Sequence, residues 1–142
     1  MQQAKLLEAR VFASSVALNN GDGTFALQPL SVTAQFAPVY ASLAADFDGD
    51  GHTDLLLAGN LYGVQPALGR YDASYGLLLH GTGNGRFESV DMEQSGLVVE
   101  GEVRHMGLLR EGGGNRLIAV ARNNDKLQIL RVIRGRPPVV RR

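Results

Sequence analysis

Residues 78–87 read LLHGTGNGRF, and residues 16–25 read VALNNGDGTF. Both stretches join an apolar run to a turn rich in glycine and asparagine and end on an aromatic residue, which is the pattern of a β-hairpin. At an offset of 62 residues the glycines and the aromatic residues superimpose: Gly21, Gly23 and Phe25 align with Gly83, Gly85 and Phe87. The sequence therefore predicts two copies of one hairpin.

The repeat continues on either side of these hairpins. DLLLAGN (54–60) falls over RLIAVAR (116–122) at the same offset. Val39 and Val103 lie 64 residues apart, so the loop that follows is two residues shorter in the later copy. From this spacing we expect the closing hairpin of one unit, a complete four-strand unit from about 37 to 92 and the opening three strands of another.

Four-strand units repeated head to tail are typical of β-propeller blades. We predict an all-β fold and a partial β-propeller of about two to two and a half four-stranded antiparallel blades; a sandwich of about nine short strands is the competing fold. Propellers close with about four to eight blades, so either further copies or further chain would cover the open blade faces. We assign residues 1–134 to the repeat region and 135–142 to a basic, disordered tail.

Composition and charge exclude several classes of protein. The 14 Lys and Arg residues balance the 14 Asp and Glu residues, so no broad basic surface for nucleic acid is expected. The absence of cysteine excludes disulfides and thiolate metal sites. No stretch reaches the roughly 18 apolar residues of a membrane span, and the N-terminus MQQAKLLEAR lacks the apolar core of a signal peptide.

The stretch DFDGDGHTD (46–54) concentrates four carboxylates, which repel one another unless a cation neutralises them or water solvates them fully. Acids at positions one, three and five can converge, because Gly49 and Gly51 between them let the backbone curl. Calcium accepts about six to eight oxygen ligands in flexible geometry. The predicted ligands are the carboxylates of Asp46, Asp48, Asp50 and Asp54 and the carbonyl of His52.

An EF-hand begins in the same way but carries glutamate at position twelve, where this chain has Leu57. The loop also follows strand-like VYASLAA (39–45) and precedes strand-like LLLAG. We therefore expect a short calcium loop between two strands of one blade, with a solvated acidic turn as the alternative. His80 and His105 show no metal-binding spacing, and we expect them to be packing or solvent-exposed residues rather than ligands.

PVYASLAADFDGDGHTDLLLAG (38–59), followed by GLLLHGTGNGRF (76–87), resembles the FG-GAP/VCBS calcium-binding repeat of integrin-α-type β-propellers. That pattern is an apolar strand, an acidic D-x-D-G-D-G-x-x-D-L loop, a second apolar strand and a G-x-G-x-F hairpin. The resemblance covers roughly residues 12–132. The segment GNLYGVQPALGRYDASYG (59–76) is similar to C-terminal regions of bacterial proteins with such repeats, some of which carry an ASPIC/UnbV domain.

The resemblance implies the same calcium ligands and a location that is extracellular, periplasmic or on the cell surface. The chain departs from the family pattern in two places. REGGGNR (110–116) stands where the later copy would have its acidic loop, so we expect one metal site per chain. The literal Phe-Gly and Gly-Ala-Pro elements are also absent, and FAP (36–38) is their nearest trace.

We expect a calcium-stabilised module that is a binding or interaction scaffold and not an enzyme. Its partner would be an unidentified protein or glycan, and the chain would form a homo-oligomer or part of a longer propeller. The alternatives are a fragment of a propeller-fold enzyme, such as a lyase or glycosidase, and a carbohydrate-binding lectin.

The long segment 61–73 is the candidate ligand loop, because long loops on rigid scaffolds commonly carry recognition. Its candidate contact residues are Tyr62, Arg70, Tyr71 and Asp72. The alternative is that Arg70 and Asp72 pair with each other while the tyrosines anchor the loop.

Overall fold

The structure is a computed structural model that describes residues 7–65, 67, 69–112, 115–133 and 139–141. The strands are β1 (Ser15–Asn19), β2 (Phe25–Pro29), β3 (Val39–Ala45), β4 (Asp54–Gly59), β5 (Leu77–Gly81), β6 (Phe87–Val90), β7 (Val103–Arg110), β8 (Arg116–Arg122), β9 (Gln128–Ile133) and β10 (Val139–Arg141). A 3-10 helix, η1 (Val32–Gln35), and a single α-helical turn, α1 (Met92–Ser95), lie between them. No helix within the described ranges has the length and apolar character needed to cross a membrane.

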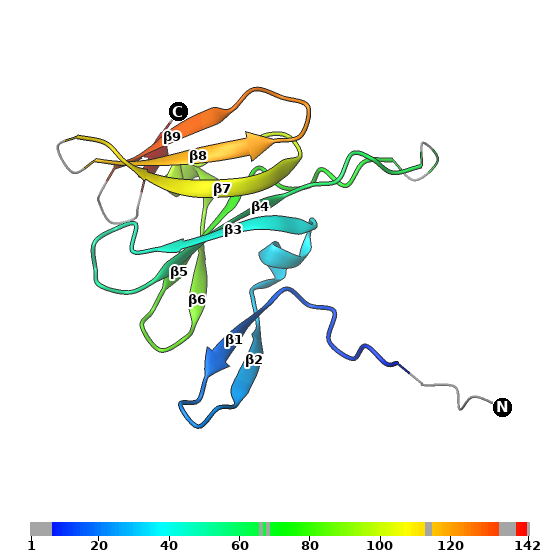
Figure 1. The fold of residues 1–142 in the computed structure, drawn as a ribbon, viewed down its shortest axis with the longest axis vertical. Helices are drawn as coiled ribbons and strands as arrows, with labels where there is room; N and C mark the ends of the chain where they lie inside the picture. The colour runs from blue at the N-terminus through cyan, green and yellow to red at the C-terminus, as the bar shows by residue number, and fades with distance from the viewer. Residues whose placement is uncertain (1–6, 66, 68, 113–114, 134–138, 142) are drawn as a thin grey trace.

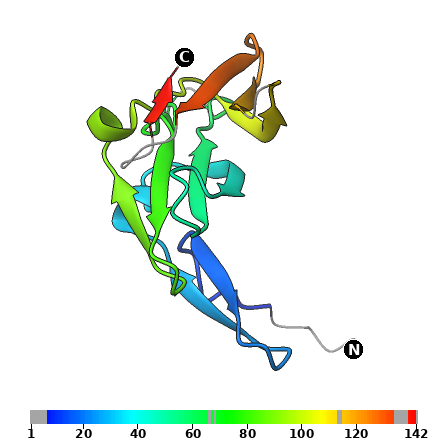
Figure 2. The ribbon, with the colours of Figure 1, turned by 90° about the vertical axis from the view of Figure 1, so that its left-hand side faces the viewer.

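The strands form three antiparallel sheets that follow one another along the chain (Figure 1). The first is the β1–β2 hairpin, the second is ordered β3-β4-β5-β6, and the third β7-β8-β9-β10. Each four-stranded sheet is a simple meander of the kind that makes a propeller blade. Seen from the side, the sheets succeed one another from the N-terminal hairpin at the bottom to β9 and β10 at the top (Figure 2). The prediction of an all-β partial propeller is confirmed.

The last strand departs from the sequence prediction. Residues 139–141 pair with β9, with Val139 opposite Ile133, and so complete a fourth strand of the third sheet. The prediction that 135–142 is a disordered tail is therefore wrong for these three residues; 135–138 and 142 lie outside the described residues. Arginines and prolines dominate the local composition, but pairing is decided by the free edge of β9, which the sequence around 139–141 does not reveal.

The main core lies between the second and third sheets, where β3 runs beside β7 (Figure 1). Leu56 and Leu78 reach it from the second sheet, and Met106, Ile118 and Leu130 reach it from the third; all five are almost fully buried. Because successive strand residues point to opposite faces, the two sheets interlock through alternate positions. This is how neighbouring blades bury faces that neither blade could cover alone.

The central strand β4 is buried on both faces, which explains why it reads as a continuous apolar run rather than an alternating one. Leu56 points toward the third sheet, whereas Leu57 joins Leu79 and Ala34 in a second core cluster on the opposite face. That second cluster is covered by η1 and the segment joining it to β2. The β3–β6 sheet is therefore covered on one face by the third sheet and on the other by η1 and the segment that precedes it.

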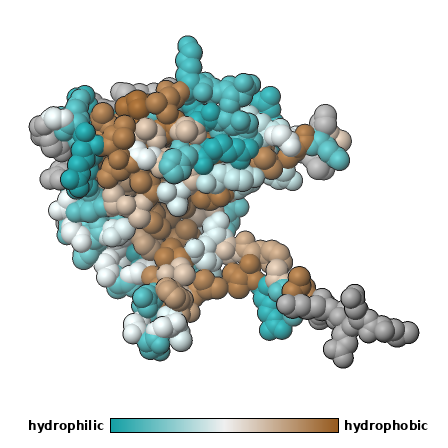
Figure 3. Space-filling view, viewed as in Figure 1, coloured by the Kyte–Doolittle hydropathy of each residue, from teal (hydrophilic) through white to brown (hydrophobic). Residues whose placement is uncertain are grey.

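The two ends of the stack carry exposed apolar side chains. At the N-terminal end these are Val11, Phe12, Phe25, Leu27 and Phe36, each more than half exposed. At the C-terminal end they are Leu109, Leu127, Ile129 and Ile133. Figure 3 shows brown, apolar surface along the lower arm, which contains β2 and the segment that precedes β1.

Two loops of the β3–β6 sheet lie at opposite ends of β4 and contain the candidate sites (Figure 1). The acidic segment 46–53 joins β3 to β4, and the long segment 60–76 joins β4 to β5. The acidic loop lies at the left of the sheet in Figure 1, and the long segment extends to the right.

Candidate metal centre

The acidic loop begins where β3 ends, at the pair formed by Ala45 and Asp54. Gly49 and Gly51 adopt φ values of 88° and 89°, a left-handed conformation that costs glycine little and other residues much more. A Cβ at either glycine would meet nothing within 4 Å, so backbone conformation and not space requires glycine here. The predicted curling of the loop around these two glycines is confirmed.

Aspartate side chains fix the curled loop from within. Asp46 accepts hydrogen bonds from the backbone N–H groups of Gly49 at 2.6 Å and Gly51 at 3.2 Å. Asp48 accepts one from the N–H of Asp50 at 3.0 Å. Such short-range bonds from aspartate to the following backbone are typical of tight turns. They hold the carboxylates at the centre of the loop instead of in bulk water.

The four predicted aspartate ligands fall into two overlapping groups. Carboxylate oxygens of Asp46, Asp48 and Asp50 lie within 4.8 Å of one another. Asp48 also belongs to a second group, with Asp54 and a nitrogen of His80, at the same spacing. The side chains of Asp48 and Asp50 are only 2% and 5% exposed, so negative charge is concentrated where water is largely excluded.

Asp54, the last acid of the stretch, is completely buried. One carboxylate oxygen accepts the N–H of Phe47 at 2.8 Å and the other accepts the N–H of Gly81 at 2.9 Å. It thereby ties the start of the loop to the end of β5. Asp54 has a structural role that needs no metal, in addition to its place beside Asp48.

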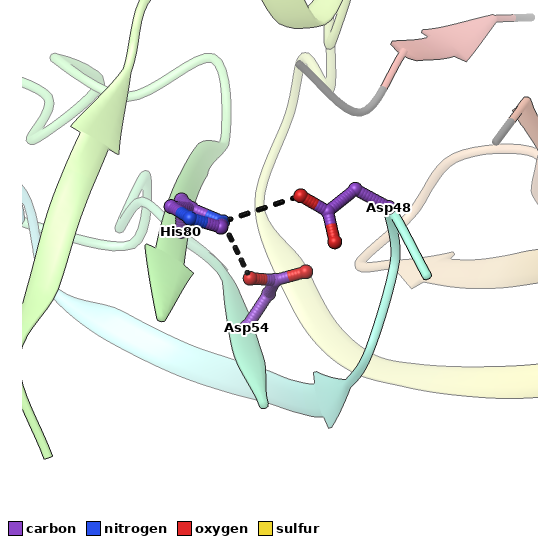
Figure 4. Close-up of side chains that lie close together, drawn as sticks. All are labelled: Asp48, Asp54 and His80. Carbon is purple, nitrogen blue, oxygen red and sulfur yellow. Dashed lines mark hydrogen bonds and ion pairs between the residues drawn. The ribbon is translucent and has the colours of Figure 1, made fainter. Parts of the chain in front are cut away.

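His80 lies beside the acidic loop, which the sequence analysis did not anticipate. Its Nδ1 lies 3.2 Å from Asp54 Oδ1 and 3.5 Å from Asp48 Oδ2 (Figure 4). Its Nε2 lies 3.8 Å from a carboxylate oxygen of Asp50. His80 thus packs against the acidic loop with 29% of its side chain exposed, and its place in a group that could hold a metal ion was not foreseen from the sequence.

Strand register explains why His80 reaches this loop. β4 and β5 pair with Leu55 opposite Leu79, and one more step along the antiparallel ladder brings Asp54 opposite His80. His52 behaves differently: its N–H donates to Asp50 at 2.8 Å, and its imidazole lies against Gly83. His105 is an exposed residue of β7, as expected.

Comparison with known protein families adds to this geometry. Residues 13–57 match the family described as an FG-GAP-like repeat, and residues 38–79 match the FG-GAP repeat. Residues 13–79 belong to the FG-GAP repeat family. No curated protein and no solved structure shows significant similarity to the chain.

The FG-GAP matches contain both the N-terminal hairpin and the acidic loop, and they end within β5. The carboxylates at 46, 48, 50 and 54 and the apolar strands on either side thus lie within the matched repeats. His80 lies one residue beyond them. The carboxylate oxygens of the two groups are the kind of ligand that a hard divalent cation prefers.

The unit that follows the FG-GAP match carries a cation where the repeat has an acid. Arg116, which begins β8, occupies the position that Asp54 has in β4 at the offset of 62 residues. Its guanidinium donates a hydrogen bond to the backbone carbonyl of Asp46. Among the described residues, no lysine or arginine side chain forms an ion pair with Asp46, Asp48 or Asp54. Arg116 therefore joins the third sheet to the acidic loop without neutralising its carboxylates by direct pairing.

The candidate ligand loop folds back on itself as a narrow hairpin. Leu61 and Tyr71 exchange backbone hydrogen bonds of 2.8 and 2.9 Å. The guanidinium of Arg70 lies over the Tyr62 ring, 4.8 Å from its centroid, a cation–π arrangement. The expected alternative, an Arg70–Asp72 ion pair, does not occur among the described residues. Tyr71 and Asp72 are exposed.

Proposed function

We propose that this FG-GAP protein is a calcium-binding propeller module whose ion stabilises the loop between β3 and β4, and that the module is a scaffold for interactions. The observation that carries the proposal is the convergence of Asp46, Asp48 and Asp50, two of them with nearly buried side chains, at one strand junction. Burying like charges together is unfavourable unless a cation compensates.

The carboxylates of Asp46, Asp48, Asp50 and Asp54 would hold the ion, together with the carbonyl of His52. When bound, the ion supplies positive charge that cancels the repulsion between these side chains. The backbone bonds described above already orient Asp46 and Asp48, so the loop is preorganised and little ordering remains to oppose binding.

A structural role follows from the location of the loop between two strands of one sheet. A ligand that binds only the folded state stabilises it by RT ln(1 + [L]/Kd), about 2.7 kcal/mol when calcium is at 100 times its Kd. For a chain of this length that corresponds to a rise in Tm of about 8 °C. The family is typically a binding or scaffold module found in extracellular or surface proteins, and we propose the same location for this chain.

Thermal melts in calcium and in chelator test the proposal. The wild type should melt at a higher temperature in calcium, and Asp48→Ala/Asp50→Ala should lose that difference. The matched control is Asp72→Ala/Asp91→Ala, which removes two exposed carboxylates and should keep the full calcium response. If the wild type melts identically in calcium and chelator, the acidic loop is a solvated turn and the proposal fails.

We propose further that neighbouring blades, from other copies of the chain or from a longer propeller, cover the two exposed apolar ends. The exposed phenylalanines at the N-terminal end and the isoleucines of β9 at the other support this, since large exposed apolar patches mark interaction surfaces. Light scattering tests assembly by this chain alone: a stable, monodisperse monomer would contradict self-assembly.

A further inference from the structure

A hollow of about 580 Å³ lies where the candidate ligand loop meets the third sheet, at the end of β4 opposite the acidic loop. We call it the interunit pocket. Tyr62 and Arg70 line it from the loop, Glu102 and Arg104 from the start of β7, and Asn124 and Asp125 from the β8–β9 turn. It therefore exists only because two repeat units pack side by side.

Buried hydrogen bonds hold the walls of the interunit pocket in place. Asn60 is 2% exposed and has a left-handed φ of 76°. Its amide donates to the carbonyls of Ser74 at 2.7 Å and Gly101 at 3.1 Å. Gly101 belongs to the segment before β7, so Asn60 links both sides of the pocket. A satisfied buried network of this kind makes a rigid, preformed site.

Glu102, which lines the interunit pocket, also links the candidate ligand loop to the third sheet. Its buried carboxylate accepts the N–H of Tyr62 at 3.0 Å and the side-chain amide of Asn123, and it forms a 2.6 Å ion pair with Arg104. Hydrogen bonds from Tyr62 and then Asn123 lower the pKa of Glu102 below its ordinary value. Glu102 is therefore a satisfied anion and not a free ligand group.

All but one of the charged side chains that line the interunit pocket form ion pairs. Arg104 pairs with Glu102 at 2.6 Å, and Asp125 pairs with Arg122 at 2.9 Å. Arg70 forms no ion pair with any carboxylate of the described residues, and its guanidinium is held over the ring of Tyr62. Arg104 is held in the same way, 4.4 Å from the centroid of Tyr40. Two oriented guanidinium groups thus line the pocket, and Arg70 retains an unmatched positive charge.

We propose that the interunit pocket binds an acidic monosaccharide unit, with the carboxylate on Arg70. Arginine binds carboxylates through paired N–H donors, and a pocket of this size falls within the usual range of about 300–1,000 Å³ for small ligands. Asn124 and Asp125 offer the amide and carboxylate groups that hydrogen-bond sugar hydroxyls. A concave pocket rather than an open strand edge favours a compact sugar over an extended peptide.

This inference deepens the proposed scaffold role by naming a ligand class, and it rests on that role but not on the metal. Calorimetric titration with glucuronate, in calcium buffer, tests it, with glucose as the neutral match and N-acetylglutamate as a carboxylate without a sugar ring. We expect saturable glucuronate binding and at least about tenfold weaker binding of the other two compounds.

The variant Arg70→Gln should weaken glucuronate binding at least about tenfold, because the unmatched charge is lost. The control Arg110→Gln removes an exposed arginine on β7 outside the pocket lining and should change nothing. A glucuronate Kd above about 10 mM, equal binding of either comparison compound, or unchanged binding by Arg70→Gln would overturn the inference. Melts of the same samples with and without calcium separate its failure from that of the metal proposal: a folded, calcium-responsive protein that ignores glucuronate overturns only the sugar site.

Discussion

Replacing Asp54 should destabilise the protein even in the absence of calcium. The buried carboxylate accepts two backbone N–H groups, those of Phe47 and Gly81, and alanine would leave both donors buried without an acceptor. Each unsatisfied donor costs about 1–3 kcal/mol. Removing the charge also relieves repulsion from Asp48, which offsets part of this cost. We expect Asp54→Ala to lower the free energy of unfolding by about 2–4 kcal/mol in chelator.

Thermal unfolding in chelator measures this effect directly. At about 3 °C per kcal/mol for a chain of this length, Asp54→Ala should melt about 6–12 °C below the wild type. Asp54→Asn keeps one acceptor oxygen, so its melting temperature should fall by roughly half as much. Asp91→Ala is the matched control, since Asp91 is exposed and its side chain makes no capping bond. A calcium-free Asp54→Ala protein that melts with the wild type would refute a structural role for this carboxylate.

Three further substitutions test the packing and electrostatics of the fold. Gly59→Ala should destabilise strongly in chemical denaturation, because the added Cβ would lie 1.7 Å from a backbone carbonyl oxygen, whereas Gly107→Ala meets nothing within 4 Å and should be neutral. The lowered pKa of Glu102 gives stability that is fully present above the ordinary glutamate pKa of 4.5 and is lost as the pH falls through the lower folded-state value. Glu102→Gln should therefore reduce the loss of unfolding free energy at acidic pH. If the loss at acidic pH is the same in Glu102→Gln, other groups cause it. Leu56→Ala, at a fully buried position between two sheets, should lower the free energy of unfolding by about 3–5 kcal/mol. Leu127→Ala, at a position that is 62% exposed, should lower it by less than about 0.5 kcal/mol. Equal losses in the two variants would contradict a core between the second and third sheets.

Local features of the fold were predictable from the sequence because they depend on short-range chemistry. Gly21 and Gly83, which the repeat aligns, adopt nearly the same φ values of 83° and 81°. The curl of the acidic loop follows in the same way from Gly49 and Gly51. Glycine adopts positive φ at little cost, so a glycine in a turn-like pattern indicates this conformation from the sequence alone.

Features that depend on tertiary neighbours were not predictable in this way. His80 reaches the acidic loop through the register of β4 against β5. The sequence does not state which leucines of the two strands pair, and only the pairing of Leu55 with Leu79 brings His80 beside Asp54. Arg116 contacts Asp46 across 70 residues of sequence. Arg70 stacks on Tyr62 and not against Asp72, because the Leu61–Tyr71 bridge places the two side chains together.

The repeat pattern predicted the N-terminal hairpin and the four-stranded sheet that follows it, but not the fourth strand of the last sheet. β10 has only three residues in a segment rich in arginine and proline, and its pairing depends on the edge that β9 provides. Such a short strand has little propensity of its own, and tertiary context decides it.

The central claim, that the acidic loop is a calcium site, is tested most directly by calorimetric titration of calcium into chelator-treated protein. One ion should bind per chain, because the third sheet carries Arg116 and no acidic loop where a second site would lie. Binding should disappear in Asp48→Ala/Asp50→Ala. An absence of saturable heat in the wild type, or undiminished binding in the double variant, would contradict the account.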